Sequence, residues 1–172
     1  MDKATELRIN ELHPARRKEV KELIEEANRV TGSEITIRLV QGFRTFSEQN
    51  GLYAQGRTKP GKKVTNSKAG QSFHNYGLAI DFAFLVKDKG EISWDIQKDW
   101  DNDKIADWLE VVQIFLKAGW VWGGNFKSIK DNPHFEKSPL SWKELLKKYN
   151  EKETFEEIIN GKKFTYVHLP TC

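Results

Sequence analysis

The spacing of apolar residues along this chain of 172 residues predicts several helices mixed with short strands. Over residues 14–30 the apolar side chains recur every three or four positions, as on the buried face of a helix. Pro14 is suited to the first turn of this helix, and Gly32 to the position that follows its end. Residues 35–39 alternate between apolar and polar side chains, which indicates a half-buried strand.

The same patterns predict the rest of the secondary structure. Thr45 and Glu48 have the spacing of a capping box, so we expect a short helix to begin here. Asp101 is placed to cap a later helix, and Gly119 to end it. The other expected elements are a long polar loop over 57–71, a strand over 77–86 paired with 91–94, a helix over 102–118, a strand over 120–122, helices over 142–149 and 151–159, and a final strand over 162–169.

These elements predict an α+β fold, in which a small antiparallel sheet is flanked by helices. No internal repeat or low-complexity linker divides the chain, so we expect a single domain over residues 1–172. A chain of this length can bury a substantial core without covalent cross-links. Its one cysteine, Cys172, cannot form a disulfide within the chain and is poorly placed for a catalytic thiol.

Charge and hydropathy argue against two classes of protein. A net charge of +3 with a pI of about 8.8 is too weakly basic to indicate nucleic-acid binding, for which a clustered basic face is expected. No apolar run approaches the roughly 20 residues that span a bilayer, so we expect no membrane insertion. The N-terminal stretch MDKATELRIN lacks the apolar region of a signal peptide.

A small set of ionisable residues has an unusual sequence setting. Asp81 interrupts an apolar strand, and a buried carboxylate must be paired, hydrogen-bonded or bound to a metal. His74 precedes Asp81, and Gly77 between them can turn the chain so that both side chains converge. His134 follows a proline, and Asp131 could fold back through the same turn to its side.

Two imidazoles and one carboxylate are a usual ligand set for a catalytic zinc ion, whose fourth position stays open. His74, Asp81 and His134 are therefore candidate zinc ligands, and a second carboxylate is then needed as general base, for which Asp131 is the candidate. Ordinary interpretations remain open: Asp81 could face water on an edge strand, and Asp131 could be a plain turn residue. The HExxH motif of thermolysin-type peptidases is absent.

Two separated motifs resemble those of a known family. Residues 72–81 read SFHNYGLAID and match the pattern S-x-H-x-x-G-x-A-x-D, while residues 131–136 read DNPHFE and match D-x-P-H-F-E. Residues 41–45 look like the G-x-R-T segment, and Trp122–Gly124 leads into the second motif. Over residues 35–136 the chain thus resembles the D-alanyl-D-alanine carboxypeptidase and L-alanyl-D-glutamate endopeptidase family, zinc peptidases of the lysostaphin- and hedgehog-like superfamily.

The resemblance implies a role for each candidate residue. It makes Asp131 the catalytic base, and it implies zinc ligation by His74, Asp81 and His134. Arg44 would bind the substrate or stabilise an oxyanion, because a guanidinium suits negative charge that develops on a carbonyl oxygen. Ser72 would orient the loop or a substrate group. Without the family, Arg44 would be assigned to a surface ion pair and Ser72 to loop capping.

The implied substrate is the stem peptide of bacterial peptidoglycan. An aspartate at the base position looks most like the endopeptidases that cut between L-Ala and D-Glu, which occur as phage endolysins and bacterial cell-wall hydrolases. The D-Ala-D-Ala dipeptidases typically carry glutamate there. The alternatives are a D-alanyl-D-alanine carboxypeptidase or dipeptidase, and a non-catalytic zinc-containing module that binds the cell wall. Retention of Asp131 beside all three ligands favours catalysis.

Such an enzyme would act as a monomer on the cell wall, in an extracellular or periplasmic space. With no signal peptide, we expect it in the cytoplasm until holin-type release, unless a leader has been removed. Glu136, Trp122 and Phe126 are expected either to line the cleft or to pack in the core. We expect no catalytic role for His13 and His168, and a core position for Trp108.

Overall fold

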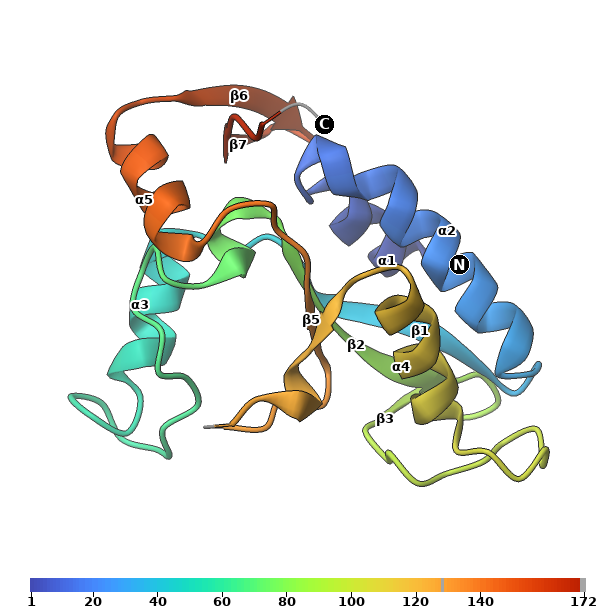
Figure 1. Cartoon of the computed structure of the whole chain (residues 1–172). Coiled ribbons are helices and arrows are strands. Elements are labelled where there is room, and N and C mark those ends of the chain that lie inside the picture. Colours follow the sequence, from blue (N-terminus) through green and yellow to red (C-terminus); the bar gives the residue numbers. More distant parts are fainter. Residues whose placement is uncertain (128, 171–172) are drawn as a thin grey trace.

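A computed structural model describes residues 1–127 and 129–170, so Cys172 lies outside the described residues. Helices and antiparallel strands are mixed along the chain, as the predicted α+β class requires (Figure 1). The elements are α1 (Lys3–Asn10), α2 (Pro14–Val30), β1 (Ile35–Gln41), α3 (Phe46–Ala54), η1 (Phe73–Tyr76), β2 (Ala79–Val86), β3 (Glu91–Ser93), α4 (Asp107–Lys117), β4 (Val121–Trp122), η2 (Gly123–Asn125), β5 (His134–Glu136), α5 (Trp142–Asn150), β6 (Thr154–Ile159) and β7 (Lys162–Val167).

The central sheet is built around β2, the strand that carries Asp81. Its strands run in the order β1-β2-β5-β4, and β3 pairs with the distal part of β2. All of these pairings are antiparallel. Within them, Asp81 lies opposite Gln41 on one side and opposite His134 on the other. The pairing therefore brings Asp81 and His134 together although they are far apart in the sequence.

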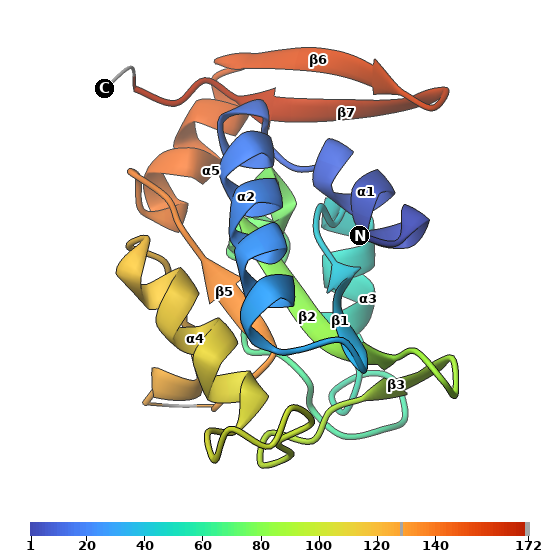
Figure 2. The ribbon, with the colours of Figure 1, turned by 90° about the vertical axis from the view of Figure 1, so that its right-hand side faces the viewer.

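Helices α2 and α4 cover one face of the sheet, with α1 packed beside β1 (Figures 1 and 2). The main core lies between these helices and the strands, and Trp108, Phe82 and Phe84 are almost completely buried there. Phe82 lies 4.3 Å from Trp108, measured between ring centroids, which confirms the core position predicted for Trp108. Each such side chain stabilises the fold by about 1.5–3 kcal/mol relative to leaving it exposed.

The C-terminal segment differs from the prediction. Residues 151–159 were expected to be helical, but Thr154–Ile159 forms strand β6, which pairs with β7. The turn between them contains Asn160 and Gly161, both with positive φ (49° and 76°). An Asn-Gly pair in this conformation gives the twist of a two-residue hairpin, and this local signal overrides the helix propensity of the glutamates before it.

One further helix boundary was wrong, and one helix was missed. The helix expected over 102–118 begins only at Asp107, and Asp101 does not cap it. Asn102 and Lys104 have φ values of 61° and 78°, which a right-handed helix does not accept. Helix α1 was not predicted, and Asp2 caps it by accepting hydrogen bonds from the second and third residues that follow it.

Most other elements lie where the sequence places them. The capping box of Thr45 and Glu48 is present at the start of α3, and Gly119 follows the end of α4 with a φ of 80°. Apart from one isolated bridge at Lys59, the stretch 57–71 contains no strand or helix. Within residues 1–127 and 129–170, none of the helices combines the length and the apolar character needed to cross a membrane.

Candidate active site

The three predicted metal ligands meet where β2 pairs with β5. Nε2 of His74 lies 3.2 Å from Oδ1 of Asp81 and 3.1 Å from Nδ1 of His134. The same Nδ1 atom lies 3.0 Å from Oδ1 of Asp81. Two imidazole nitrogens and one carboxylate oxygen thus form a compact triangle, and this donor set can hold a metal ion.

Gly77 lets the chain return from His74 to Asp81. It has a φ of 67°, a left-handed conformation that glycine adopts without strain, and its amide donates a hydrogen bond to the His74 carbonyl. A Cβ atom at this position would lie 2.5 Å from the backbone nitrogen of His13. The turn that was expected at Gly77 is therefore present, and no larger residue fits it.

Each imidazole has a hydrogen-bond acceptor at its second nitrogen. Nδ1 of His74 lies 2.7 Å from the carbonyl oxygen of Gly42, and Nε2 of His134 lies 2.9 Å from Oε2 of Glu136. A nitrogen that faces an acceptor carries a proton, so each neutral ring turns a lone pair toward Asp81. Carbonyl and carboxylate partners of this kind orient histidines in metal sites.

The residues fit a zinc ion. Ligands at about 2.0–2.1 Å from a tetrahedral zinc lie roughly 3.3 Å apart. The three donor atoms are separated by 3.0 to 3.2 Å, close to that spacing. When both rings are neutral, their lone pairs and an oxygen of Asp81 converge on one point, and this arrangement can bind a cation.

The charges of the cluster favour a cation as well. Burial opposes ionisation of Asp81, yet His74 and His134 hold the pKa of this carboxyl group well below its usual range. For His134, burial lowers the pKa, but hydrogen bonds to Asp81 and Glu136 outweigh it and raise the pKa to about 9. Two carboxylates therefore stabilise positive charge at this point in the cleft.

Arg44 lies beside the cluster. Its Nη2 atom is 3.5 Å from Oδ2 of Asp81, and its Nη1 atom donates a 3.0 Å hydrogen bond to Gln49. The Arg44 amide donates to the carbonyl of His74, which links this residue to the same turn. Burial lowers the pKa of Arg44, and the negative charge of Asp81 opposes that effect. The guanidinium is thus held in place before any substrate binds.

Asp131 is placed by a close approach to Gly123. The Asp131 amide donates to the carbonyl of Gly123, and the His134 amide donates to the carbonyl of Asp131. A Cβ atom on Gly123 would lie 2.4 Å from the Asp131 carbonyl oxygen. Burial, and then the charge of Asp81, raise the pKa of the Asp131 carboxyl group. A raised pKa suits a group that must exchange protons near neutral pH.

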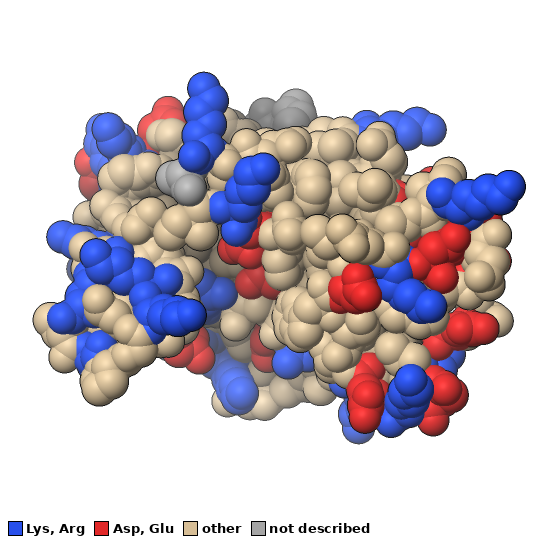
Figure 3. Space-filling model, turned by 90° about the horizontal axis from the view of Figure 1, so that it is seen from below, with Lys and Arg blue, Asp and Glu red and all other residues tan. Residues whose placement is uncertain are grey.

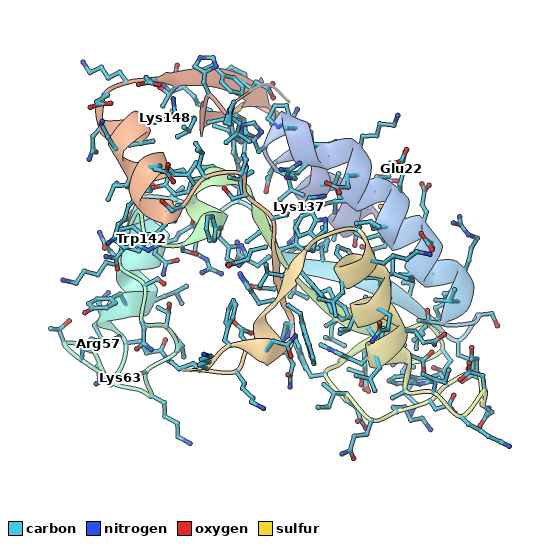
Figure 4. The ribbon with its side chains drawn as sticks, in the orientation of Figure 1. Glu22, Arg57, Lys63, Lys137, Trp142 and Lys148 are labelled. Atoms are coloured by element: carbon cyan, nitrogen blue, oxygen red, sulfur yellow. The ribbon has the colours of Figure 1, made fainter. Side chains whose placement is uncertain are left out.

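These residues line a cleft of about 530 Å³. Ser72, Phe126 and Glu136 are in its wall, whereas Trp122 packs against the core and donates a 2.7 Å hydrogen bond to the Asn132 carbonyl. Figure 4 shows Trp142 at the start of α5, on the side of the cleft toward α3. The complete lining is Arg44, Leu52, Val64, Thr65, Asn66, Ser67, Gln71, Ser72, Phe73, His74, Asp81, Phe126, Ile129, Asp131, His134, Glu136 and Trp142.

The other two histidines lie outside the cleft. His13 is buried at the start of α2, where its Nε2 lies 3.0 Å from the Val167 carbonyl oxygen and its Nδ1 accepts a hydrogen bond from Ala15. His168 packs against Phe155 at the end of the C-terminal hairpin. Neither side chain lines the cleft or belongs to the triangle of donor atoms.

Three supporting groups were not predicted from the sequence. Asn75 donates to the Arg44 carbonyl and accepts from the Gly70 amide, so it links the end of the 57–71 loop to Arg44. Gln49 bonds both Arg44 and the carbonyl of Ser67. The backbone carbonyl of Gly42 leaves no signal in a sequence, but Asn75 and Gln49 are polar residues beside the motifs that carry the ligands.

Comparisons with known proteins support the family resemblance. Residues 65–137 match the model of a protein family described as D-alanyl-D-alanine carboxypeptidase, which confirms the family resemblance over that segment. The chain is 51% identical over 105 residues to the peptidoglycan L-alanyl-D-glutamate endopeptidase CwlK of Bacillus subtilis (strain 168). The aligned region covers 61% of this chain and 62% of the length of that relative.

A solved structure has a similar fold. It is the crystal structure of the L-Ala D-Glu endopeptidase ChiX of Serratia marcescens, with a TM-score of 0.54 and 23% sequence identity. The match covers 84% of this chain and 91% of the Serratia chain. This likeness confirms the α+β fold class predicted from the sequence.

Proposed function

We propose that this chain is a zinc-dependent peptidase that hydrolyses the stem peptide of peptidoglycan between L-alanine and D-glutamate. One observation carries the proposal: the donor atoms of His74, Asp81 and His134 lie within 3.2 Å of one another in a cleft shared with Arg44 and Asp131. The names of the Bacillus relative and the Serratia structure support this choice of bond.

In the proposed reaction, His74, Asp81 and His134 hold the zinc ion, which supplies Lewis acidity to polarise a carbonyl and acidify water. Asp131 takes a proton from the attacking water and returns it to the leaving amine of D-glutamate. Arg44 stabilises the negative charge that develops on the carbonyl oxygen. Ser72, in the wall of the cleft, orients the bound peptide.

The surface beside the cleft suits an anionic peptide. Figure 3 shows Lys and Arg side chains gathered on the left, where Figure 1 places the loop between α3 and η1. Figure 4 labels two of them, Arg57 and Lys63. The same loop supplies cleft residues Val64 to Ser67. A stem peptide carries several carboxylates, and a basic rim raises its local concentration and its rate of association.

A second candidate is a D-alanyl-D-alanine carboxypeptidase, because the matching family model carries that description. Both activities would use the same metal site and the same base. They differ in the bond that is cut, and therefore in the products. A module that only binds the cell wall would keep the metal and release no product.

The whole chain is proposed to act as one catalytic domain on the cell wall. The C-terminal hairpin is joined to the N-terminal helices by the ion pair of Arg17 and Glu157 at 2.6 Å and by the contact of His13 with Val167. All residues of the proposed site come from one chain, so a monomer suffices for catalysis.

The test is release of free amino groups from purified peptidoglycan. The protein is stripped with a chelator, reloaded with zinc and compared with His74→Ala treated in the same way. We expect hydrolysis only by the reloaded unaltered protein, because the variant lacks one of three ligands. Equal hydrolysis by His74→Ala, or by the stripped protein, would refute the zinc-dependent reaction. Zinc binding without release of amines would favour the binding module.

A further inference from the structure

The segment before and into α4 carries five carboxylates that the proposed peptidase reaction does not use. They occupy positions 1, 3, 5, 9 and 12 of the twelve-residue segment 99–110, the spacing of side-chain ligands in a calcium-binding loop. Such loops have glycine at position 6, where this chain has Lys104. Lys104 nevertheless has a φ of 78°, the left-handed conformation that the glycine normally provides.

The fold brings these carboxylates together. Ligand oxygens of Asp99, Asp101 and Asp103 lie within 4.8 Å of one another, and so do those of Asp101, Asp107 and Glu110. Asp101 belongs to both groups, so the five residues form one acidic cluster. The cluster shares no residue with the His74 site. Figure 1 shows the segment beside β3 and at the start of α4, and none of its residues lines the cleft.

Two buried oxygens in the cluster lack partners. Asp107 is 0% exposed, and its Oδ1 atom has no hydrogen-bond partner among the described residues. Glu110 is partly buried, and its buried Oε2 atom also has no partner among them. Over residues 1–127 and 129–170, no Lys, Arg or His nitrogen lies within 4.0 Å of a carboxylate oxygen of the five residues. Burying an unpaired carboxylate is costly unless a metal compensates it.

The ionisation of the cluster agrees with this geometry. Burial raises the pKa of Glu110 to about 7, and the neighbouring carboxylates of Asp103 and Asp101 add to the effect. Burial, with Asp101 and Asp99 as contributing charges, also raises the pKa of Asp107. Among the described residues no cationic side chain forms an ion pair with this cluster, and a bound divalent cation would neutralise its negative charge.

We propose that residues 99–110 bind one Ca²⁺ ion through the carboxylates of Asp99, Asp101, Asp103, Asp107 and Glu110. The main-chain carbonyl of Ile105, at position 7, is the further oxygen ligand expected from the spacing. All donors are hard oxygens and several carboxylates converge, which suits the six to eight ligands of Ca²⁺. Magnesium retains more of its water, and zinc favours nitrogen and sulfur ligands.

Ca²⁺ at this position stabilises the packing of residues 99–110 against the main core. Oδ2 of Asp107 accepts a 2.7 Å hydrogen bond from the amide of Trp100, and the Trp100 ring lies 5.3 Å from that of Phe84, measured between centroids. Trp108, also in the segment, is buried against Phe82 and Phe84. The ion would therefore stabilise both the loop and the first turn of α4, on which this part of the core depends.

Terbium luminescence and calorimetry of the zinc-loaded protein test the proposal. Trp100 and Trp108 lie inside the segment and can transfer energy to bound Tb³⁺. We expect a Tb³⁺ signal that Ca²⁺ removes and Mg²⁺ does not, with one Ca²⁺ bound per chain in a titration up to about 10 mM, which covers the weakest class of such sites. At about a hundredfold excess over the Kd, the melting temperature should rise by roughly 5–10 °C.

Variants separate this site from nonspecific binding. Asp101→Asn and Glu110→Gln should each weaken Ca²⁺ binding by at least about tenfold, since each removes one charged ligand. Asp95→Asn is the matched control, because Asp95 is exposed, belongs to the same loop and lies outside the cluster. In calcium-free buffer Glu110→Gln should melt no lower than the unaltered protein, because it relieves repulsion. No Ca²⁺-sensitive Tb³⁺ signal, or equal affinity in all three variants, would overturn the proposal, and neither readout depends on peptidase activity.

Discussion

The Nε2 atom of His134 lies 2.9 Å from Oε2 of Glu136, two residues along the same strand. Alternate residues of a strand share one face, so both side chains lie on the cleft side while Phe135 between them is buried in the core. The carboxylate accepts the ring proton and leaves Nδ1 free to face Asp81. Glu136 would thus position His134 in the proposed metal site.

Glu136→Gln should therefore weaken zinc binding roughly 10–100-fold, as is usual when the outer hydrogen-bond partner of a ligating histidine is changed. The amide keeps the shape of the side chain but loses its charge. Competition with a chromophoric chelator measures the affinity. Glu151→Gln is the control, because that carboxylate is exposed at the end of α5 and its one ion pair among the described residues is with Lys147. Equal affinities in the two variants would show that Glu136 has no role at the metal.

Asp131→Asn should retain zinc and lose turnover. The substitution keeps the size of the side chain and the backbone contacts with Gly123, but an amide cannot take a proton from water. General base catalysis contributes about 10²–10⁴-fold, so kcat should fall by that factor with bound zinc near one per chain. Metal analysis measures the zinc that the variant retains, and product release from the same preparation measures its turnover. Normal turnover would exclude Asp131 as the base.

The candidate ligand set could be proposed from the sequence because its residues violate local patterns. Asp81 stands out in an apolar strand, and His74 and His134 stand beside Gly77 and a proline. The antiparallel pairing of β2 with β5 joins Asp81 to His134 but involves only three residues of each strand, too few for a periodic signal. Main-chain partners such as the Gly42 carbonyl depend on tertiary structure alone.

Elsewhere the sequence contained signals that other patterns outweighed. Asn160-Gly161 is a strong hairpin indicator, yet the glutamates before it favour helix, and the strand β6 was missed. Asp101 has a residue type that suits a helix cap, but it lies in the acidic cluster before α4. Propensity is a weak guide where a turn or a ligand cluster fixes the backbone.

Gly123→Ala should destabilise the protein and Gly51→Ala should not. A Cβ atom on Gly123 would meet the Asp131 carbonyl at 2.4 Å, whereas nothing lies within 4 Å of one on Gly51 in α3. Overpacking of this kind costs about 1–3 kcal/mol, while alanine inside a helix gains up to about 1 kcal/mol over glycine. Urea unfolding gives both free energies. A Gly123→Ala protein of unchanged stability would contradict the close approach.

Stability should fall at mildly acidic pH because His13 is buried in its neutral form. Burial lowers the pKa of His13 below the ordinary histidine value of about 6.5; Arg16 and Arg17 add to this, while the Val167 carbonyl and Glu157 oppose it. The rings of Phe155 and Tyr166 pack against it. The unfolded chain binds the proton more readily, so the contribution is complete above pH 6.5 and is lost as pH falls through the folded pKa.

Unfolding in urea at pH 7.5 and 5.5 measures this dependence. The loss of unfolding free energy between the two values should be smaller in His13→Gln than in the unaltered protein, because glutamine does not titrate. The same loss in both proteins would assign the pH dependence to other groups.

The central claim is best tested by mass spectrometry of purified peptidoglycan digested with the zinc-loaded protein, using His134→Ala as the control. The account predicts new peptides with D-glutamate or D-isoglutamine at the amino terminus, formed only by the unaltered protein. Release of free D-alanine instead would keep a zinc peptidase but contradict the bond assigned here. No products from any of several wall types, with zinc bound, would contradict peptidase activity altogether.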